Sequence, residues 1–428
     1  IDYDYGQSRH GLTYSRRLST GYINNTEYDI ESLSYSGSLL TSAGMIRFSG
    51  RYCDKEFGAY KFYSDAFPNE WEATETGLLS ASADLTVGSI RLSPKLFYRR
   101  HTDDFVLDRD RPSFYRNNHR TDHYGAELQT DFDSPVGRIA VGVELAAEEI
   151  ESSNLGPHYR SRKGMFVENR IRPTDRLIIV PGASFYHHNG YGWQAYPGLD
   201  INYRINKKLQ AYGTVGRAYR VPTFTELYYV SPANMGNRDL RPEKSVTWET
   251  GLKWSQNWLN GSLAYFERHG RDMIDWVRPA DVVPYQVQNI SRTTTRGVEI
   301  EARFRLKSLI SNSSVDLVTV GYSYFDTERS SRGFQQKYFL DQVRHQVTMS
   351  VNYHWISSVD QNWSVRYLKR YDRKSHTIVD SRLTADMKAV TLFAELTNLF
   401  DVDFVETGSI PMPGRWFRMG LKLSTEMF

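Results

Sequence analysis

The sequence predicts an all-β protein whose strands form a wide transmembrane antiparallel barrel, and three observations carry this prediction. Apolar and polar residues alternate at period two along most of the chain. Tight and long connections between the alternating segments succeed one another regularly. Phe, Trp and Tyr make up 14% of the 428 residues, a high share for a chain whose mean hydropathy is only -0.55.

The alternation is clearest in the second half of the chain. Residues 246–254 alternate Val, Trp, Thr, Leu and Trp with Thr, Glu, Gly and Lys, and residues 318–324, 347–355 and 363–367 repeat the pattern. One face of each strand is therefore apolar or aromatic, and the other is small, polar or charged. We find no convincing helical stretch of ten or more residues, so the fold class is all-β.

The connections between these strands alternate in length. Tight links fall at residues 41–44, 87–89, 133–137, 172–176 and 206–208, and longer ones at 56–74, 102–120, 151–163, 220–244, 272–290, 328–344 and 401–415. A transmembrane barrel sorts its connections in this way, with short periplasmic turns at one rim and long external loops at the other. The scheme gives about 20 strands, of roughly 21 residues each with its connection.

A barrel with a wet lumen also accounts for the composition. Half of each strand faces water, so mean hydropathy stays low, while the surplus Tyr and Trp residues are expected in the aromatic girdles at the two interfaces. A soluble β-sandwich array or adhesin also has alternating strands, but its polar face does not need so many aromatic strand ends.

Charge and cysteine content exclude other classes of protein. The net charge of +3 is spread without a basic block, so no nucleic-acid partner is expected. Lone Cys53 excludes an intramolecular disulfide and a Cys-based zinc site. Nowhere do 18 apolar residues run together, which excludes a transmembrane helix. The sequence opens at Ile1 without Met or a leader, so we expect a mature or cleaved product.

One segment carries a family resemblance. Residues 217–249 read RAYRVPTFTELYYVSPANMGNRDLRPEKSVTWE: a strand stopped by Pro222, a Tyr-rich loop, a turn at 234–237 and a second strand. The segment resembles the loop signature of TonB-dependent outer-membrane receptors, in which an FRAP-like box precedes an NPNL-like box. The matching residues are Tyr219, Arg220, Val221 and Pro222, then Asn237, Arg238, Asp239 and Leu240.

Three further segments resemble the same family in the same order. Residues 266–277 with 289–299 are similar to its strand–loop–strand pair, and 398–401 with 411–415 to its last loop. Near the front, residues 56–74 resemble a loop typical of cobalamin receptors in Bacteroidetes-like organisms. The resemblance therefore spans most of the chain, and it is closest to cobalamin and siderophore receptors.

The resemblance implies a barrel of the 22-strand plugged type. Eleven strands precede the recognised loop where thirteen are expected, so residues 1–428 are expected to be the barrel domain. We expect the plug and the first barrel hairpin upstream of residue 1 or on another chain, because open sheet edges in lipid leave backbone groups unpaired. A miscount of one hairpin is the alternative.

The function that the resemblance implies is TonB-dependent active uptake of a scarce nutrient across the bacterial outer membrane. Cobalamin is the first choice of cargo, from the front loop and the compact barrel, and a ferric siderophore is the second. A passive pore or a structural barrel component of a membrane complex is the alternative of another class. The implied partners are the plug segment, the TonB complex, outer-membrane lipid and a surface lipoprotein.

Aromatic residues in the long external loops form the candidate ligand site. Large amphipathic ligands need apolar faces for contact area and a few polar groups for orientation. For each aromatic, an interface girdle or packing within the loop is the alternative. The candidates are Phe62, Tyr63, Trp71, Tyr115, Tyr228, Tyr229 and Trp276, with Arg220 and Asn234 as polar partners.

Metal and catalytic sites receive weaker support. Asp103, Asp104, Asp108 and Asp110 are weak candidates for Ca²⁺, but the arginines between them favour salt-bridged loop surface. Adjacent His187 and His188 would point to opposite faces of a strand and so could not chelate together. In the family, haem receptors carry a His between the two boxes, and residues 223–236 contain none. Since no G-x-S-x-G motif occurs, we do not expect an enzyme. Apart from the weakly supported Ca²⁺, we expect no resident cofactor.

Overall fold

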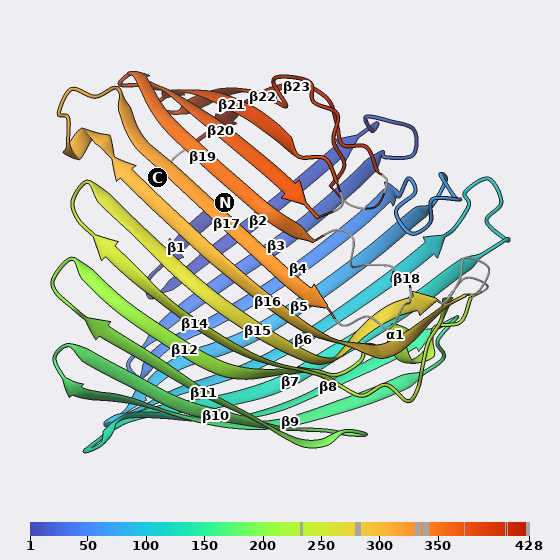
Figure 1. The fold of residues 1–428 in the computed structure, drawn as a ribbon, viewed down its shortest axis with the longest axis horizontal. Helices are drawn as coiled ribbons and strands as arrows, with labels where there is room; N and C mark the ends of the chain where they lie inside the picture. The colour runs from blue at the N-terminus through green and yellow to red at the C-terminus, as the bar shows by residue number, and fades with distance from the viewer. Residues whose placement is uncertain are drawn as a thin grey trace.

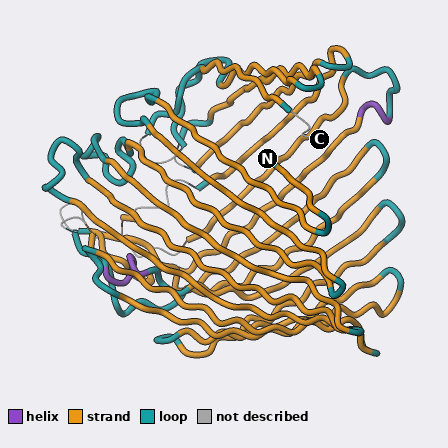
Figure 2. The backbone as a smooth tube through the Cα atoms, turned by 180° about the vertical axis from the view of Figure 1, so that it is seen from behind, coloured by secondary structure: helices purple, strands orange, loops and turns teal. Residues whose placement is uncertain are grey.

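The fold is a single antiparallel sheet that curls into a wide barrel (Figures 1 and 2). The structure, a computed structural model, describes residues 1–231, 234–278, 284–329, 335–336, 342–371, 373–406, 408 and 410–424. In these ranges the helices are α1, of 5 residues, and the 3-10 helix η1, of 3. None of the described helices is both long enough and apolar enough to cross a bilayer.

The strands run through the chain with regular spacing. Their bounds are β1 Asp2–Tyr5, β2 Ser8–Ser19, β3 Tyr28–Thr41, β4 Gly44–Gly58, β5 Trp71–Val87, β6 Ile90–Val106, β7 Arg116–Ser134, β8 Gly137–Ser152, β9 His158–Thr174, β10 Leu177–His188, β11 Gly192–Arg204, β12 Leu209–Arg220, β13 Asn234–Met235, β14 Glu243–Ser255, β15 Leu259–Arg278, β16 Tyr285–Arg305, β17 Val315–Arg329, β18 Gln335–Gln336, β19 Val343–Ile356, β20 Val359–Arg370, β21 His376–Met387, β22 Val390–Thr397 and β23 Trp416–Leu423. Helix α1 is Phe224–Tyr228, between β12 and β13, and η1 is Leu306–Ser308, between β16 and β17.

Each long strand pairs in antiparallel fashion with the next long strand along the chain. Apart from the short strands β1, β13 and β18, twenty strands of eight or more residues are described. Eleven of them, β2 to β12, precede the recognised loop. The predicted fold class and the predicted strand count are confirmed.

The two rims of the barrel differ as the connection lengths predict. In Figure 1 tight turns gather at the left end and longer loops at the right. The turns at residues 42–43, 88–89 and 135–136 belong to the first rim, and the loops at 59–70, 107–115 and 221–242 belong to the second. We call these the turn rim and the loop rim.

Alternation along the strands separates a lipid face from a lumen face. Outward side chains such as Leu79, Leu96 and Val143 are 61%, 59% and 56% exposed, as apolar groups in contact with lipid must be. Nearer the loop rim, the outward face carries a belt of tyrosines, which we call the tyrosine belt. Within it, the Tyr98 hydroxyl donates to Asp122 at 2.7 Å, and the Tyr124 hydroxyl donates to Glu149 at 2.9 Å. This belt marks the outer interface of the bilayer.

The strands continue well beyond this belt. β15 and β16 contain 20 and 21 residues, whereas about 9–11 suffice to cross a bilayer. The loops predicted at 102–120 and 151–163 are therefore shorter than expected: β6 ends at Val106 and β9 begins at His158. Charged cross-strand pairs stabilise these extensions; for example, Arg116 on β7 binds Asp104 on β6.

On the lumen face, aromatic rings cover glycines of the neighbouring strand. Phe166 of β9 lies directly opposite Gly142 of β8, and a Cβ atom added to this glycine would collide with the ring. The same arrangement joins Phe97 with Gly125, Tyr186 with Gly164, Tyr212 with Gly251, Phe266 with Gly297 and Phe393 with Gly420. Part of the aromatic excess therefore lies inside the barrel.

The first and last strands approach each other at the loop rim. The Tyr22 hydroxyl, in the β2–β3 loop, donates a 2.7 Å hydrogen bond to the Pro411 carbonyl in the β22–β23 loop. Within the described residues no ladder joins β23 to β1 or β2. That another segment supplies the missing strands and a plug stays a prediction.

Candidate functional site

The β12–β14 loop begins with a short, capped helix. Thr223 is the N-cap of α1: its side chain accepts from the Glu226 N–H at 3.1 Å, and the Glu226 carboxylate accepts from the Thr223 N–H at 2.7 Å. This reciprocal pair satisfies two backbone donors that the first turn leaves free. Pro222, which precedes the cap, is fully buried. The sequence thus fixes the direction in which the loop leaves the wall.

Apolar side chains of α1 pack against residues of the β8–β9 hairpin on one side and of β16 on the other. Phe224 contacts Ile150 and Leu155 at the β8–β9 hairpin, and Leu227 contacts Leu240 and Val287. Both α1 residues are 8% exposed. The loop therefore spans the mouth of the lumen between β8–β9 and β15–β16.

A network of hydroxyl and amide groups lies beside this apolar contact. The Tyr115 and Tyr229 hydroxyls are 2.8 Å apart, and the side-chain amides of Asn117 and Asn154 donate to the Tyr115 hydroxyl at 3.1 and 3.3 Å. Asn154 also donates to the Val230 carbonyl at 2.8 Å. Loops that lie far apart in the sequence thus converge on one polar cluster.

Residues of the recognised motif hold the loop in place. Arg220 binds Glu226 through two nitrogens, at 2.9 and 3.0 Å, and binds Glu243 at 2.7 Å. The Asn237 side chain donates to the Val287 carbonyl at 3.1 Å, and Leu240 is 3% exposed. In this structure these residues position the mouth from within the protein.

The front loop forms a second aromatic group at the mouth. Phe62 and Tyr63 pack edge to face with ring centroids 4.9 Å apart, and Tyr63 packs on Phe105 of β6 at 4.8 Å. The Tyr63 hydroxyl donates to the buried carboxylate of Glu72, and its N–H donates to Glu70 at 2.8 Å. Phe62 and Tyr63 nevertheless remain 55% and 46% exposed.

Asp103 faces the lumen beside this group, beyond the tyrosine belt. Burial, followed by the negative charges of Glu72 and Asp104, raises the pKa of Asp103 to about 7. Its Oδ1 atom is buried and has no hydrogen-bond partner in the described part of the chain. Near neutral pH this carboxyl group therefore changes charge at the lining of the mouth.

The remaining predicted ligand residues lie in the same region, but their side chains are largely engaged with the protein. Tyr228 stacks on His158 with centroids 3.6 Å apart, and Trp276 packs edge to face on Tyr229 at 6.3 Å. Trp71 is the first residue of β5, with the Arg109 guanidinium over its ring. Asn234 belongs to β13, which pairs with β16.

The predicted Ca²⁺ ligands do not converge. Asp104 binds Arg116, Asp108 binds Arg111, and Asp110 accepts from Asn69, whereas Asp103 faces the lumen. Within the described ranges no group of three or more His, Cys, Asp and Glu residues could hold a metal ion. His187 contacts Trp193, and His188 contacts Tyr186 and Tyr219, as expected for neighbours on opposite faces.

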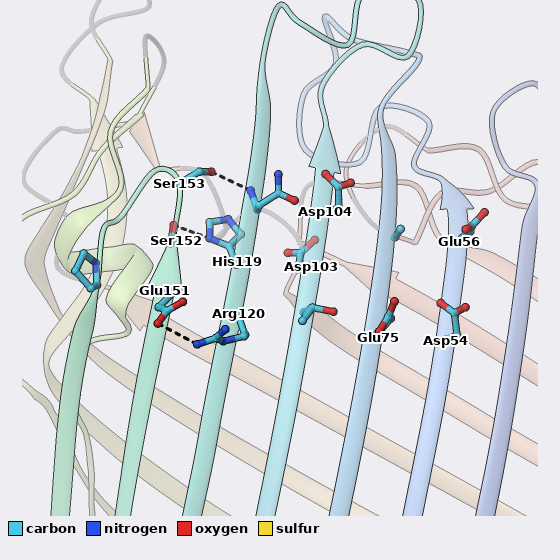
Figure 3. Close-up of a pocket in the computed structure, with 14 residues that line it drawn as sticks. Asp54, Glu56, Glu75, Asp103, Asp104, His119, Arg120, Glu151, Ser152 and Ser153 are labelled. Carbon is cyan, nitrogen blue, oxygen red and sulfur yellow. Dashed lines mark hydrogen bonds and ion pairs between the residues drawn. The ribbon is translucent and has the colours of Figure 1, made fainter.

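An acid-rich cavity of about 660 Å³ lies on β4–β8 toward the loop rim (Figure 3). Asp54 and Glu75 lie opposite each other in the β4–β5 ladder, on the same face as Phe48 and Leu79. That face is the lipid-facing one, but Asp103 and His119 also line the cavity, so it is not closed off from the group around Tyr63. Beside it, Arg120 binds Glu151 at 2.9 Å.

Sequence reasoning missed several residues of the mouth. Asn117 and Asn154 hold Tyr115, and the Arg160 guanidinium lies over the Phe224 ring at 4.8 Å. His158 completes the stack on Tyr228. Single polar residues at strand ends carry no local signal, so their partners could be known only from the fold.

Comparisons with known proteins agree with this architecture. Residues 1–399 match the family model described as TonB dependent receptor-like, beta-barrel. A vitamin B12 transporter, BtuB, of Photobacterium profundum is 25% identical over 362 residues, which cover 80% of this chain and 56% of that protein. A probable TonB-dependent siderophore receptor, PirA, of Acinetobacter baumannii is 31% identical over 125 residues, covering 26% of this chain and 17% of the relative. The chain thus spans less than two thirds of either relative.

Solved structures share the fold at low sequence identity. The copper transporter OprC matches with a TM-score of 0.80 and 13% identity, covering 98% of this chain and 76% of that structure. The FrpB iron transporter of Neisseria meningitidis gives a TM-score of 0.79 and 13% identity, covering 98% and 77%. At such identities the likeness concerns the fold alone.

Proposed function

Because the chain belongs to the TonB-dependent receptor-like β-barrel family of the outer membrane, we propose that it forms the barrel of a TonB-dependent transporter that takes up cobalamin. External loops would capture the ligand, and a plug segment driven by the TonB complex would open the path. A surface lipoprotein is a further proposed partner. The family and the fold are those of receptors and transporters.

The observation that carries this proposal is the chemistry of the mouth. Phe62 and Tyr63 offer exposed aromatic surface on one side, and the Tyr115–Tyr229–Asn154 cluster offers hydroxyl and amide groups on the other. A corrinoid is large and amphipathic, with apolar edges and amide side groups, so both surfaces suit it. The length of the matches also favours cobalamin: the BtuB match covers 80% of this chain, and that of the ferrienterobactin receptor of Escherichia coli covers 36%.

A ferric siderophore is the second candidate cargo, because the PirA relative is more identical, at 31%, over its shorter match. Aromatic contacts serve a catecholate chelate as well as a corrinoid. The two candidates differ in their polar demands, since a ferric chelate carries negative charge and a corrinoid mainly presents amides.

Uptake by whole cells tests the proposal. Cells that lack their own cobalamin receptor and produce the complete protein should accumulate radiolabelled cyanocobalamin in a saturable, TonB-dependent manner. A Tyr63→Ala variant should bind at least about tenfold more weakly, since it loses aromatic contact area worth about 1.5–3 kcal/mol. Phe114→Ala, which removes an exposed aromatic of the neighbouring loop, is the matched comparison.

Two results would redirect the assignment. Saturable uptake of a ferric chelate without cobalamin binding would make the protein a siderophore receptor. Ion conductance in planar bilayers, with no saturable binding of either ligand, would make the barrel a passive pore.

A further inference from the structure

A cavity of about 610 Å³ opens in the barrel wall where β11 and β12 separate. The β11–β12 ladder ends at the pair Gly198–Gly216. β11 nevertheless continues beside β10 to Gly192, and β12 continues beside β14 to Arg220. The ends of β11 and β12 nearest the loop rim therefore flank a gap, and Pro197, which has no N–H to donate, directly precedes the last pair.

Three cations line this cavity on the lipid-facing side of the wall. Arg217 of β12 lies opposite Val246 of β14, and Lys244 lies two residues from Val246 on the same face. Arg271 of β15 lies directly opposite Lys244. Val246 and Trp248 continue this face toward the bilayer and are 37% and 36% exposed, so the cations point away from the lumen.

The direct opposition of Lys244 and Arg271 is unfavourable as it stands. Like charges facing each other across an antiparallel pair repel, and Arg217 adds a third positive charge on the diagonal. Within the described residues none of the three cations forms an ion pair. The nearby carboxylates are already engaged: Asp272, which also lines the cavity, binds Arg241 at 2.7 Å, and Glu267 binds His269 and Arg296.

The cavity also contains a donor without a partner and an exposed indole. The Tyr219 hydroxyl is buried and has no hydrogen-bond partner in the described part of the chain. Its ring lies edge to face with Tyr196, at 5.7 Å, and also contacts His188 at 6.1 Å. Trp193 at the edge of the cavity is 56% exposed.

The position along the strand matches the headgroup layer. Trp248 and Tyr265 pack at 5.3 Å on the same outer face and continue the aromatic belt around the barrel. Lys244 lies four residues beyond Trp248, which is about 13 Å along the strand. Because the strands are tilted, the distance between the two residues along the membrane normal is shorter. Charged groups of an outer-leaflet lipid lie at this depth.

We propose that Arg217, Lys244 and Arg271 bind a phosphate group of an outer-leaflet lipid on the outer surface of β12–β15. The phosphate relieves the repulsion between the two opposed cations. Trp193 and Val246 contact the apolar part of the same lipid. The site is independent of the cargo that the mouth carries.

The test is a thermal unfolding experiment on the full protein, in neutral detergent without and with added lipid A. In phosphate-free neutral detergent, Lys244→Gln should raise the melting temperature by a degree or more, because it removes the repulsion. With bis-phosphorylated lipid A added, wild-type protein should gain several degrees and Lys244→Gln should gain less than half as much. Native mass spectrometry should show at least a fivefold loss of bound lipid A in the Lys244→Gln, Arg271→Gln double variant.

Control experiments distinguish binding of the whole lipid from binding of its phosphate group alone. Arg16→Gln, which removes an outward cation already paired with Asp29 and Glu31, should leave lipid A binding unchanged. Dephosphorylated lipid A should bind wild-type and variant equally. An equal gain in stability from inorganic phosphate at the same concentration would overturn the lipid assignment, and unchanged lipid A binding by the double variant would overturn the site.

Discussion

Aromatic side chains have three different tasks in this barrel. Tyr98 and Tyr124 mark the interface, Phe62 and Tyr63 face the mouth, and Phe166 covers Gly142 on the lumen wall. Period-two alternation predicts the first group, because it places Tyr on the apolar face. It does not predict the third, since Phe and Gly in neighbouring strands form a pair only once the register is known.

Asp103 makes the mouth sensitive to pH. Its folded-state pKa of about 7 lies above the ordinary value of 3.8, so folding favours the protonated form. The stability that the folded protein gains from protonated Asp103 is fully present below about pH 4 and is lost as the pH rises through 7. Asp103→Asn should therefore raise the melting temperature at pH 8 and have little effect at pH 4, with about 1–2 kcal/mol gained at high pH after allowance for solvent screening.

Thermal unfolding in detergent at several pH values measures this difference. Asp110→Asn, in the exposed β6–β7 loop, serves as the control and should show no comparable change with pH. Equal effects of Asp103→Asn at pH 4 and pH 8 would contradict the assignment of a raised pKa.

At the scale of elements, the β12–β14 loop depends on ion pairs at its base. Arg220 joins Glu226 of α1 to Glu243 of β14, and Glu226 also completes the cap of that helix. Arg220→Gln leaves both carboxylates without their cation and should loosen the loop by about 1 kcal/mol. Trypsin should then cleave the loop after Arg238 several times faster.

The barrel itself should not respond to this change. Arg47→Gln removes a comparable pair with Asp84 on the lumen wall and should leave loop cleavage at its wild-type rate. A fall in the melting temperature of the whole barrel in Arg220→Gln, without faster cleavage, would show that Arg220 supports the wall and not the loop.

The elements also show how far the sequence predicts this fold. Strand positions such as 246–254 were predictable, because alternation is local and one face must contact lipid. The ends of the strands could not be predicted, because charged residues beyond the tyrosine belt resemble loop residues in sequence. Only the fold shows that they pair across strands, as Arg116 does with Asp104. In the site, the motif identified the loop, but contacts such as Tyr115 with Tyr229 join residues 114 positions apart.

At the scale of the whole molecule, the two rims predict an orientation in the membrane. Long loops should face outward and tight turns should face the periplasm. On a Cys53→Ser background, Ser113→Cys in the β6–β7 loop should react with a membrane-impermeant maleimide on intact cells. Ser89→Cys in the β5–β6 turn should react only after the outer membrane is permeabilised.

Both positions are exposed, so accessibility alone does not distinguish them. Labelling of Ser89→Cys but not Ser113→Cys on intact cells would reverse the orientation. Native Cys53 is buried, which keeps the background of the wild-type chain low as well.

The hydrogen bond between Tyr22 and Pro411 has a consequence for the order of assembly. Its partners are 389 positions apart, whereas the ladders of the long strands join neighbours in sequence. Each hairpin closes a short segment at small entropic cost, but the contact between the β2–β3 and β22–β23 loops must wait for the intervening strands. We therefore expect the wall to grow one hairpin at a time and the contact between these two loops to form only after the strands between them have paired.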